Sequence, residues 1–155
     1  MKSLLIACTV IFMSCASTSS QKSSAVQENA ELLVSESQGG ADTSGFTIIK
    51  DEKDFRNRIR GSFGVVDLDK ESYIKYPSFP KNKKVVLYNL GTFRSGSHKI
   101  DEIKSASVKN QILYVEVPAG ELSGGMEIQV MSNPWIIFTV PANYQFTSVE
   151  LKYSK

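Results

Sequence analysis

The sequence has few of the residues from which catalytic and metal sites are built. Its 155 residues include two cysteines and a single histidine, His98. A zinc site needs three or four ligands, and His98 has no second histidine and no free cysteine to accompany it. We therefore expect no metal, no cofactor and no catalytic centre.

A charge excess of one sign is also missing. Lys and Arg total 18 against 16 for Asp and Glu, so the composition does not favour a nucleic-acid partner. The lysines at 81, 83 and 84 lie near aromatic residues, but we interpret them as a solvated turn that enters a strand. The alternating acids after position 66 suggest a calcium loop, yet Ser72 and Ser78 stand where that loop needs glycine and glutamate, so calcium is not expected.

The longest N-terminal apolar run, residues 4–13, is too short to span a membrane and follows one cation, Lys2, as in a secretory signal. Ser14, Cys15 and Ala16 then resemble the lipobox of bacterial lipoproteins, with Phe12 where an aliphatic residue is more usual. We expect cleavage after residue 14 and acylation of Cys15, which anchors the protein in the membrane. Because Cys8 leaves with the signal, the mature chain would have no disulfide.

Residues 15–44 are rich in Ser, Gly and Gln, which predicts a disordered tether between Cys15 and the folded part. Within it, residues 31–34 could form at most a transient helical turn. We expect a single β-rich domain over residues 45–155, which is long enough to bury a core. Because Ala16 is not acidic, an outer-membrane location in the bacterial cell envelope is favoured over the inner membrane.

The hydrophobic pattern predicts several short strands and one helix. Asp51 is the expected N-cap of a helix over 51–60 that buries Phe55 and Ile59. Strands are expected at 45–50, 85–90, 97–108 (with a bulge near 101–102), 112–117, 126–131, 136–140 and 149–153. Residues 136–140 are apolar throughout, which is typical of a strand buried on both faces. The predicted fold class is α+β and β-rich: a small antiparallel sheet, a sandwich or a partly open barrel, with its helix near the domain's start.

The stretch from 83 to 100 organises the chain, because a buried strand runs into a glycine-punctuated loop, residues 91–98. A Ser-His pair there is chemically conceivable, with Asp101 or Glu102 orienting the imidazole. However, Ser97 and His98 would project to opposite faces of a strand, and such triads normally draw on separate segments. We therefore predict that the protein is not an enzyme.

The order of short motifs resembles the C-terminal domain of the PrcB family. It includes Ile-Lys-Asp-Glu-Lys-Asp-Phe, Val-Val-Leu-Tyr-Asn-Leu-Gly, Ser-Gly-Ser-His and a Pro-Trp strand, over about residues 46–141. The family's loop pattern maps onto Gly91, Ser95, Gly96, Ser97 and His98, with Ser97 replacing a usual second glycine. Family members are exported bacterial proteins, and the founding example is an accessory subunit of a cell-surface protease complex. The resemblance implies a similar accessory role.

The sequence therefore predicts a non-enzymatic envelope lipoprotein that binds another envelope or secreted protein, such as a protease. Aromatic and arginine side chains are enriched at binding hot spots, and a loop tip exposes them. The candidate contact residues are Gly91, Phe93, Arg94, Ser95, Gly96, Ser97, His98 and Trp135. The alternative is a module that binds an envelope glycan or small ligand by stacking on Trp135, Tyr88 and Tyr144.

Overall fold

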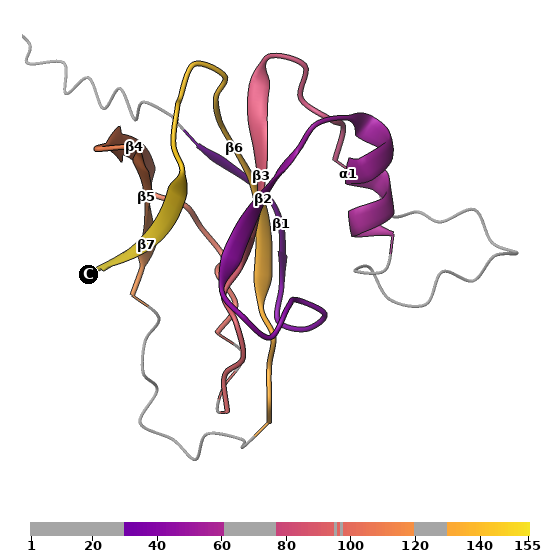
Figure 1. Ribbon diagram of the computed structural model, residues 1–155. Helices are drawn as coiled ribbons and strands as arrows, with labels where there is room; N and C mark the ends of the chain where they lie inside the picture. The colour runs from indigo at the N-terminus through magenta and orange to yellow at the C-terminus, as the bar shows by residue number, and fades with distance from the viewer. Residues whose placement is uncertain (1–29, 61–76, 95, 97, 120–129) are drawn as a thin grey trace, which may run out of the picture.

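The computed structural model of the protein describes residues 30–60, 77–94, 96, 98–119 and 130–155. The strands form a four-stranded sheet, ordered β1-β6-β3-β2, and a three-stranded sheet, ordered β4-β5-β7. One short helix, α1, lies outside the four-stranded sheet (Figure 1). This arrangement confirms the predicted β-rich α+β class, in the form of a small sandwich. The elements are β1 (Glu31–Glu36), β2 (Gly45–Ile49), α1 (Glu52–Ile59), β3 (Lys83–Asn89), β4 (Ser105–Lys109), β5 (Ile112–Pro118), β6 (Trp135–Pro141) and β7 (Ser148–Ser154).

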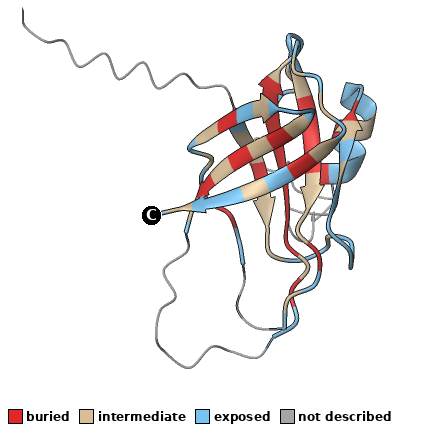
Figure 2. Ribbon diagram, turned by 60° about the vertical axis from the view of Figure 1, so that its left-hand side comes forward, coloured by how far each residue is buried: buried red, intermediate tan, exposed pale blue. Residues whose placement is uncertain are grey.

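Strand β6 is the centre of the fold. All its residues from Trp135 to Val140 are buried, and Figure 2 shows buried residues in red. In the neighbouring strand β3, only the central residues Val85 to Leu87 are buried. The side chains of β6 alternate between two cores, since Ile136 and Phe138 pack between the sheets and Trp135 and Ile137 pack toward the helix. The prediction of a strand covered on both faces is confirmed.

The helix forms where the sequence predicts it. Asp51 is the N-cap, and its carboxylate accepts a hydrogen bond of 2.8 Å from the amide of Asp54. Phe55 and Ile59 lie one turn apart and are almost completely buried against the four-stranded sheet, so the short helix is held by this apolar pair. Arg56 faces solvent, as expected.

The predicted tether is wrong at its C-terminal part, because residues 31–36 form strand β1. This strand pairs antiparallel with β6 and covers what would otherwise be the edge of the sheet. The composition of this serine-rich region did not predict a strand. The strand forms because the segment pairs with an apolar neighbour in the folded sheet. The folded domain therefore includes residues 31–36, which lie before residue 45.

The predicted strand 97–108 is also wrong over its first half, since only Ser105–Lys109 forms a strand, β4. His98 has a left-handed backbone, with φ of 47°, which no strand accommodates. Ile100 and Ile103 both pack on the core between the sheets, as predicted, but an irregular segment achieves this without a bulge. The following turn is confirmed, with φ of 53° at Asn110 and 62° at Gln111.

The sequence analysis predicted antiparallel pairing throughout. The structure differs from this prediction, because β5 and β7 run parallel. The period-two pattern identified both strands correctly, but it carries no information on their relative direction. The predicted strand 126–131 lies outside the described residues except for Val130 and Met131, which are not in a strand. In the part of the chain that is described, no helix has the length and apolar character needed to cross a membrane.

Candidate functional site

Three loops meet at one end of the four-stranded sheet, and we call this the loop end: residues 37–44, 90–98 and 130–134. Backbone hydrogen bonds join them. Leu90 donates to Pro134 (2.9 Å) and Thr92 donates to Asp42 (3.1 Å). Phe93 and Ser132 exchange two bonds of 2.8 and 2.9 Å, as paired strands do. The predicted loop is therefore fixed at its base by segments that are distant in sequence.

Side chains complete this base. Asn133 donates from Nδ2 to Asp42 Oδ1 (3.0 Å) and to Thr92 Oγ1 (2.8 Å). The amide of Ala41 donates to Asn89 Oδ1 at 3.0 Å. Gly40 packs so closely that a Cβ there would lie 2.6 Å from the Asn133 carbonyl oxygen. Side-chain hydrogen bonds therefore join the three loops in addition to the backbone bonds.

The tip of the loop presents an aromatic pair and a cation. The rings of Phe93 and His98 stack with centroids 3.9 Å apart and planes inclined by 22°. Phe93 is half-buried, whereas Arg94 and His98 are exposed. Gly96 has a positive φ of 68°, which glycine adopts without strain, and its carbonyl accepts a hydrogen bond of 3.1 Å from Ser132 Oγ.

The structure brings together only part of the predicted contact set. Gly91 is buried at the base with φ of 92°, and Phe93, Arg94, Gly96 and His98 lie at the tip. Ser95 and Ser97 lie outside the described residues, as do residues 1–29 with Cys15.

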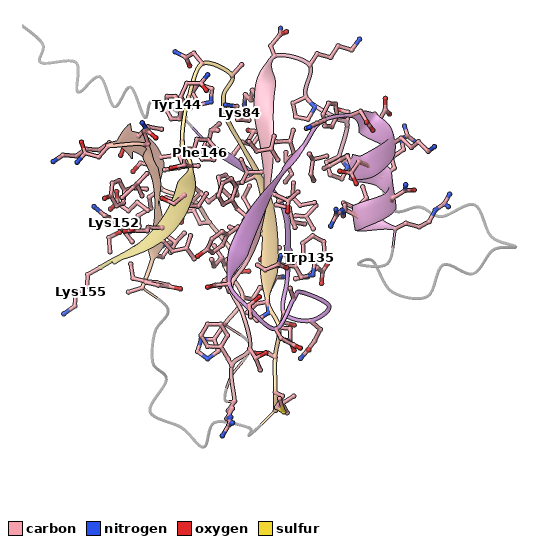
Figure 3. All side chains as sticks on the ribbon, in the orientation of Figure 1. Lys84, Trp135, Tyr144, Phe146, Lys152 and Lys155 are labelled. Carbon is pink, nitrogen blue, oxygen red and sulfur yellow. The ribbon has the colours of Figure 1, made fainter. Side chains whose placement is uncertain are left out.

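Trp135 does not belong to the contact surface, and its prediction as a contact residue is corrected. Its side chain is only 5% exposed, and its Nε1 donates to the Gln38 carbonyl at 2.9 Å. Figure 3 shows Trp135 turned from β6 toward the loop that follows β1. The indole therefore fixes the base of the loop end from inside.

The predicted stacking platform of Trp135, Tyr88 and Tyr144 does not form. Trp135 belongs to the core on the helix side, whereas Tyr88 and Tyr144 pack against the core between the sheets. Tyr144 also lies at the opposite end of the molecule, beside Lys84 and Phe146, as Figure 3 shows. A ligand cannot contact all three rings at once.

Sequence reasoning missed the exposed apolar side chains of the loop end. Among the described residues, the large hydrophobic side chains that remain exposed are Val130 (49%), Met131 (64%) and Tyr153 (60%). Val130 and Met131 directly precede Ser132, the partner of Phe93. The only sequence signal for this was the placement of Met131 on the wet face of a predicted strand.

A groove of about 350 Å³ opens beside the loop, between the two sheets. Tyr88 from β3 and Leu90 and Phe93 from the loop face Leu151 and Tyr153 from β7. Ser44, Val149 and Glu150 complete the lining. Burial, and next the proximity of Tyr153 and Glu150, raise the pKa of the Tyr88 phenol above its usual value. The Tyr88 hydroxyl is therefore neutral at physiological pH and can donate or accept a hydrogen bond.

The opposite end of the four-stranded sheet, where β1 begins, has a different character, and we call it the tether end. Lys83 and Glu31 form an exposed ion pair of 2.8 Å. Lys84 donates to the Tyr144 carbonyl and lies 5.2 Å from the centre of the Phe146 ring. The polar groups of the tether end therefore contact one another within the chain.

The described residues contain no group of three or more His, Cys, Asp or Glu side chains that could hold a metal ion. Comparison with protein-family models, with curated proteins and with solved structures finds no match for this chain. The PrcB resemblance, the lipoprotein signal and the protein-binding role therefore stay predictions.

Proposed function

We propose that this chain is a non-enzymatic lipoprotein of the bacterial envelope whose loop end binds another protein, as an accessory module. The observation that carries this proposal is the position of the exposed apolar side chains. Val130, Met131 and Tyr153 are the large hydrophobic residues exposed in the described part of the chain. Val130 and Met131 belong to the loop end, and Tyr153 lines the groove together with Phe93 from the loop. Apolar side chains gathered in this way favour a protein contact.

The chemistry of the tip supports the same proposal. Arg94 and the stacked Phe93 and His98 stand among these apolar side chains, and Arg and aromatic residues are the types most enriched in binding hot spots. The hydrogen-bonded base means that few backbone degrees of freedom remain to be ordered on binding.

The direction of β1 is consistent with a membrane anchor at Cys15. Glu31 pairs with Thr139 and Glu36 pairs with Trp135, so the chain enters the sheet at the tether end. The loop end lies about 20 Å further along, the length of a strand such as β6. An anchor at Cys15 would therefore join the folded part of the chain at the tether end and leave the loop end free for a partner.

The PrcB resemblance directs the choice of partner to a secreted or surface protease, which this module would help to assemble or stabilise. The alternative, a module for an envelope glycan or small ligand, keeps only Tyr88 of its three predicted rings in the groove. We place it second for that reason.

The test is recovery of partners with the full-length acylated protein from detergent-solubilised envelope. The affinity tag belongs in the exposed turn at residues 142–143, at the tether end, because the C-terminus follows Tyr153 at the groove. The double variant that carries both Phe93→Ala and Arg94→Ala should reduce recovery of a stoichiometric partner by about tenfold or more, since hot-spot truncations each cost about 2 kcal/mol.

The matched control is Glu31→Ala with Lys83→Ala, which removes an exposed ion pair from the tether end and should leave recovery unchanged. Arg94→Glu alone separates recognition from folding, because it alters an exposed side chain. Equal recovery with the loop-end and tether-end variants would contradict the proposal.

A further inference from the structure

The groove follows the free edge of strand β7. Its lining includes the consecutive residues Val149, Glu150 and Leu151, whose side chains alternate between the two faces of the sheet. A site that contacts both faces of one strand must run along its edge. The groove is therefore a slot between this edge and the end of the opposite sheet, where Ser44, Tyr88 and Leu90 lie.

The backbone of β7 is available on that side. Within the described residues, β7 is the last strand of its sheet and pairs only with β5, and β2 across the gap belongs to the other sheet. An edge strand presents a row of unpaired amide and carbonyl groups, which an extended peptide can extend as a further strand. The exposed Tyr153 stands at one end of this edge.

The charge of the slot indicates what such a peptide carries. Glu150 is exposed and forms no ion pair with the described part of the chain, and no cationic side chain lines the groove. Lys152 follows Glu150 by two residues and shares its face of β7, but it lies over the ring of Tyr114, 3.8 Å from its centre, and forms no ion pair with Glu150. The carboxylate is therefore left for a cation from outside.

The apolar lining suits a basic side chain with a long aliphatic stem. Leu90, Leu151 and Val149 can cover the methylene groups of Lys or Arg, while the charged head stays at the mouth. The rings of Tyr88, Phe93 and Tyr153 offer faces on which a cation is attracted. A volume of about 350 Å³ is enough for one such side chain.

We propose that an extended segment of the partner protein adds to the free edge of β7 and places a Lys or Arg side chain in the slot, against Glu150. This inference rests on the proposed protein-binding function and specifies the chemistry of the partner. It also makes the slot and the loop tip one continuous contact surface, because Phe93 belongs to both.

The test uses the full-length protein in detergent micelles and a capped pentapeptide, Thr-Val-Arg-Val-Thr, followed by amide NMR shifts. A peptide with citrulline in place of arginine has the same shape without the charge. We expect shifts at β7 and an affinity for the arginine peptide about fivefold higher than for citrulline, as for a partly exposed ion pair.

Glu150→Gln should remove this preference, and Glu52→Gln is the matched control, because it deletes the same charge from α1 on the far side of the four-stranded sheet. Absence of shifts at millimolar peptide, or equal affinities for both peptides, would overturn the proposal. Shifts in the groove with chitotriose and none with peptide would also overturn it and favour the glycan alternative.

The two proposals can fail separately. Partner recovery could be lost in the Phe93→Ala, Arg94→Ala double variant and unaffected by Glu150→Gln. This result would support the protein-binding function and reject the binding of a basic peptide in the slot. Charge-selective peptide binding without any recovered partner would retain the slot and reject the accessory role.

Discussion

The two ends of the four-stranded sheet differ in which polar groups have hydrogen-bond partners and in which side chains are exposed. At the loop end, Trp135 Nε1 and Ser132 Oγ have partners and Met131 is exposed, although the buried hydroxyl of Ser35, which pairs with Ile136 beside this end, has no partner among the described residues. Toward the tether end, the exposed contacts are an ion pair and a lysine held by a carbonyl, and the buried hydroxyl of Thr139 has no partner among the described residues. Ordered backbone beneath exposed apolar side chains is what a recognition surface requires, and only the loop end combines the two.

The largest expected effect comes from adding one methyl group at the base of the loop end. Gly40→Ala would place a Cβ 2.6 Å from the Asn133 carbonyl oxygen, which belongs to the backbone and cannot rotate away. We expect a loss of about 1–3 kcal/mol of unfolding free energy, as for other overpacked sites. Urea unfolding followed by the emission of Trp135, the single tryptophan, measures it.

Gly45→Ala is the matched control, because no atom lies within 4 Å of the position that its new methyl group would take. It should be neutral or stabilising by up to about 1 kcal/mol. If both substitutions had the same effect, the close packing of the loop that follows β1 would be refuted.

The buried indole should give the next largest effect. Trp135→Phe leaves the Gln38 carbonyl without its donor and removes part of a packed ring, so we expect a loss of about 1–2 kcal/mol. Tyr144→Phe, which removes only a long 3.4 Å bond to the Ala106 carbonyl, should cost less than about 0.5 kcal/mol. Thermal unfolding by circular dichroism compares them, and a larger loss for Tyr144→Phe would argue against the role of Trp135.

Thr139→Val tests the side of the sheet toward the tether end, and we expect it to raise the free energy of unfolding where Gly40→Ala and Trp135→Phe lower it. The substitution keeps the side chain's shape and removes an unpartnered buried hydroxyl, so we expect a gain of about 0.5–1 kcal/mol. Ser132→Ala removes a partnered hydroxyl at the loop end and should lose about 1 kcal/mol. Two losses of equal size in urea unfolding would remove this distinction between the ends.

The smallest effect concerns the groove and appears only at alkaline pH. Burial raises the pKa of Tyr88 in the folded protein, so the phenol ionises more easily in the unfolded chain. Its contribution is fully present below the unfolded pKa, near 10.0, and is lost as pH rises through the folded value. Tyr88→Phe should therefore lose less stability than the unmodified protein as the pH rises above about 10.0. An unchanged or steeper alkaline decline would contradict the burial of this phenol.

Much of the fold could be predicted from local signals. Asp51 with Phe55 and Ile59 encodes the helix within one stretch of sequence, and the unbroken apolar run of β6 encodes its burial on both faces. Strand β1 could not be predicted, because its pairing with β6 depends on residues about a hundred positions away. The parallel direction of β7 is likewise a property of the assembled sheet.

The candidate site divides in the same way. Glycine spacing predicted the loop and its exposed Arg94, but the left-handed backbone that stacks His98 on Phe93 has no local signature. The groove could not be predicted, since Tyr88 and Tyr153 meet only after both sheets have formed. Trp135 was misassigned because tryptophan serves both cores and interfaces, and burial alone separates the two.

The most direct test of the account is site-specific photocrosslinking in the intact envelope, with a photoreactive phenylalanine placed in the full-length protein at position 94 or at position 83. Both side chains are exposed, one at each end of the sheet. The account predicts a discrete crosslinked protein from position 94 and none from position 83. Crosslinking to the same protein from position 83 alone would contradict recognition through the loop end.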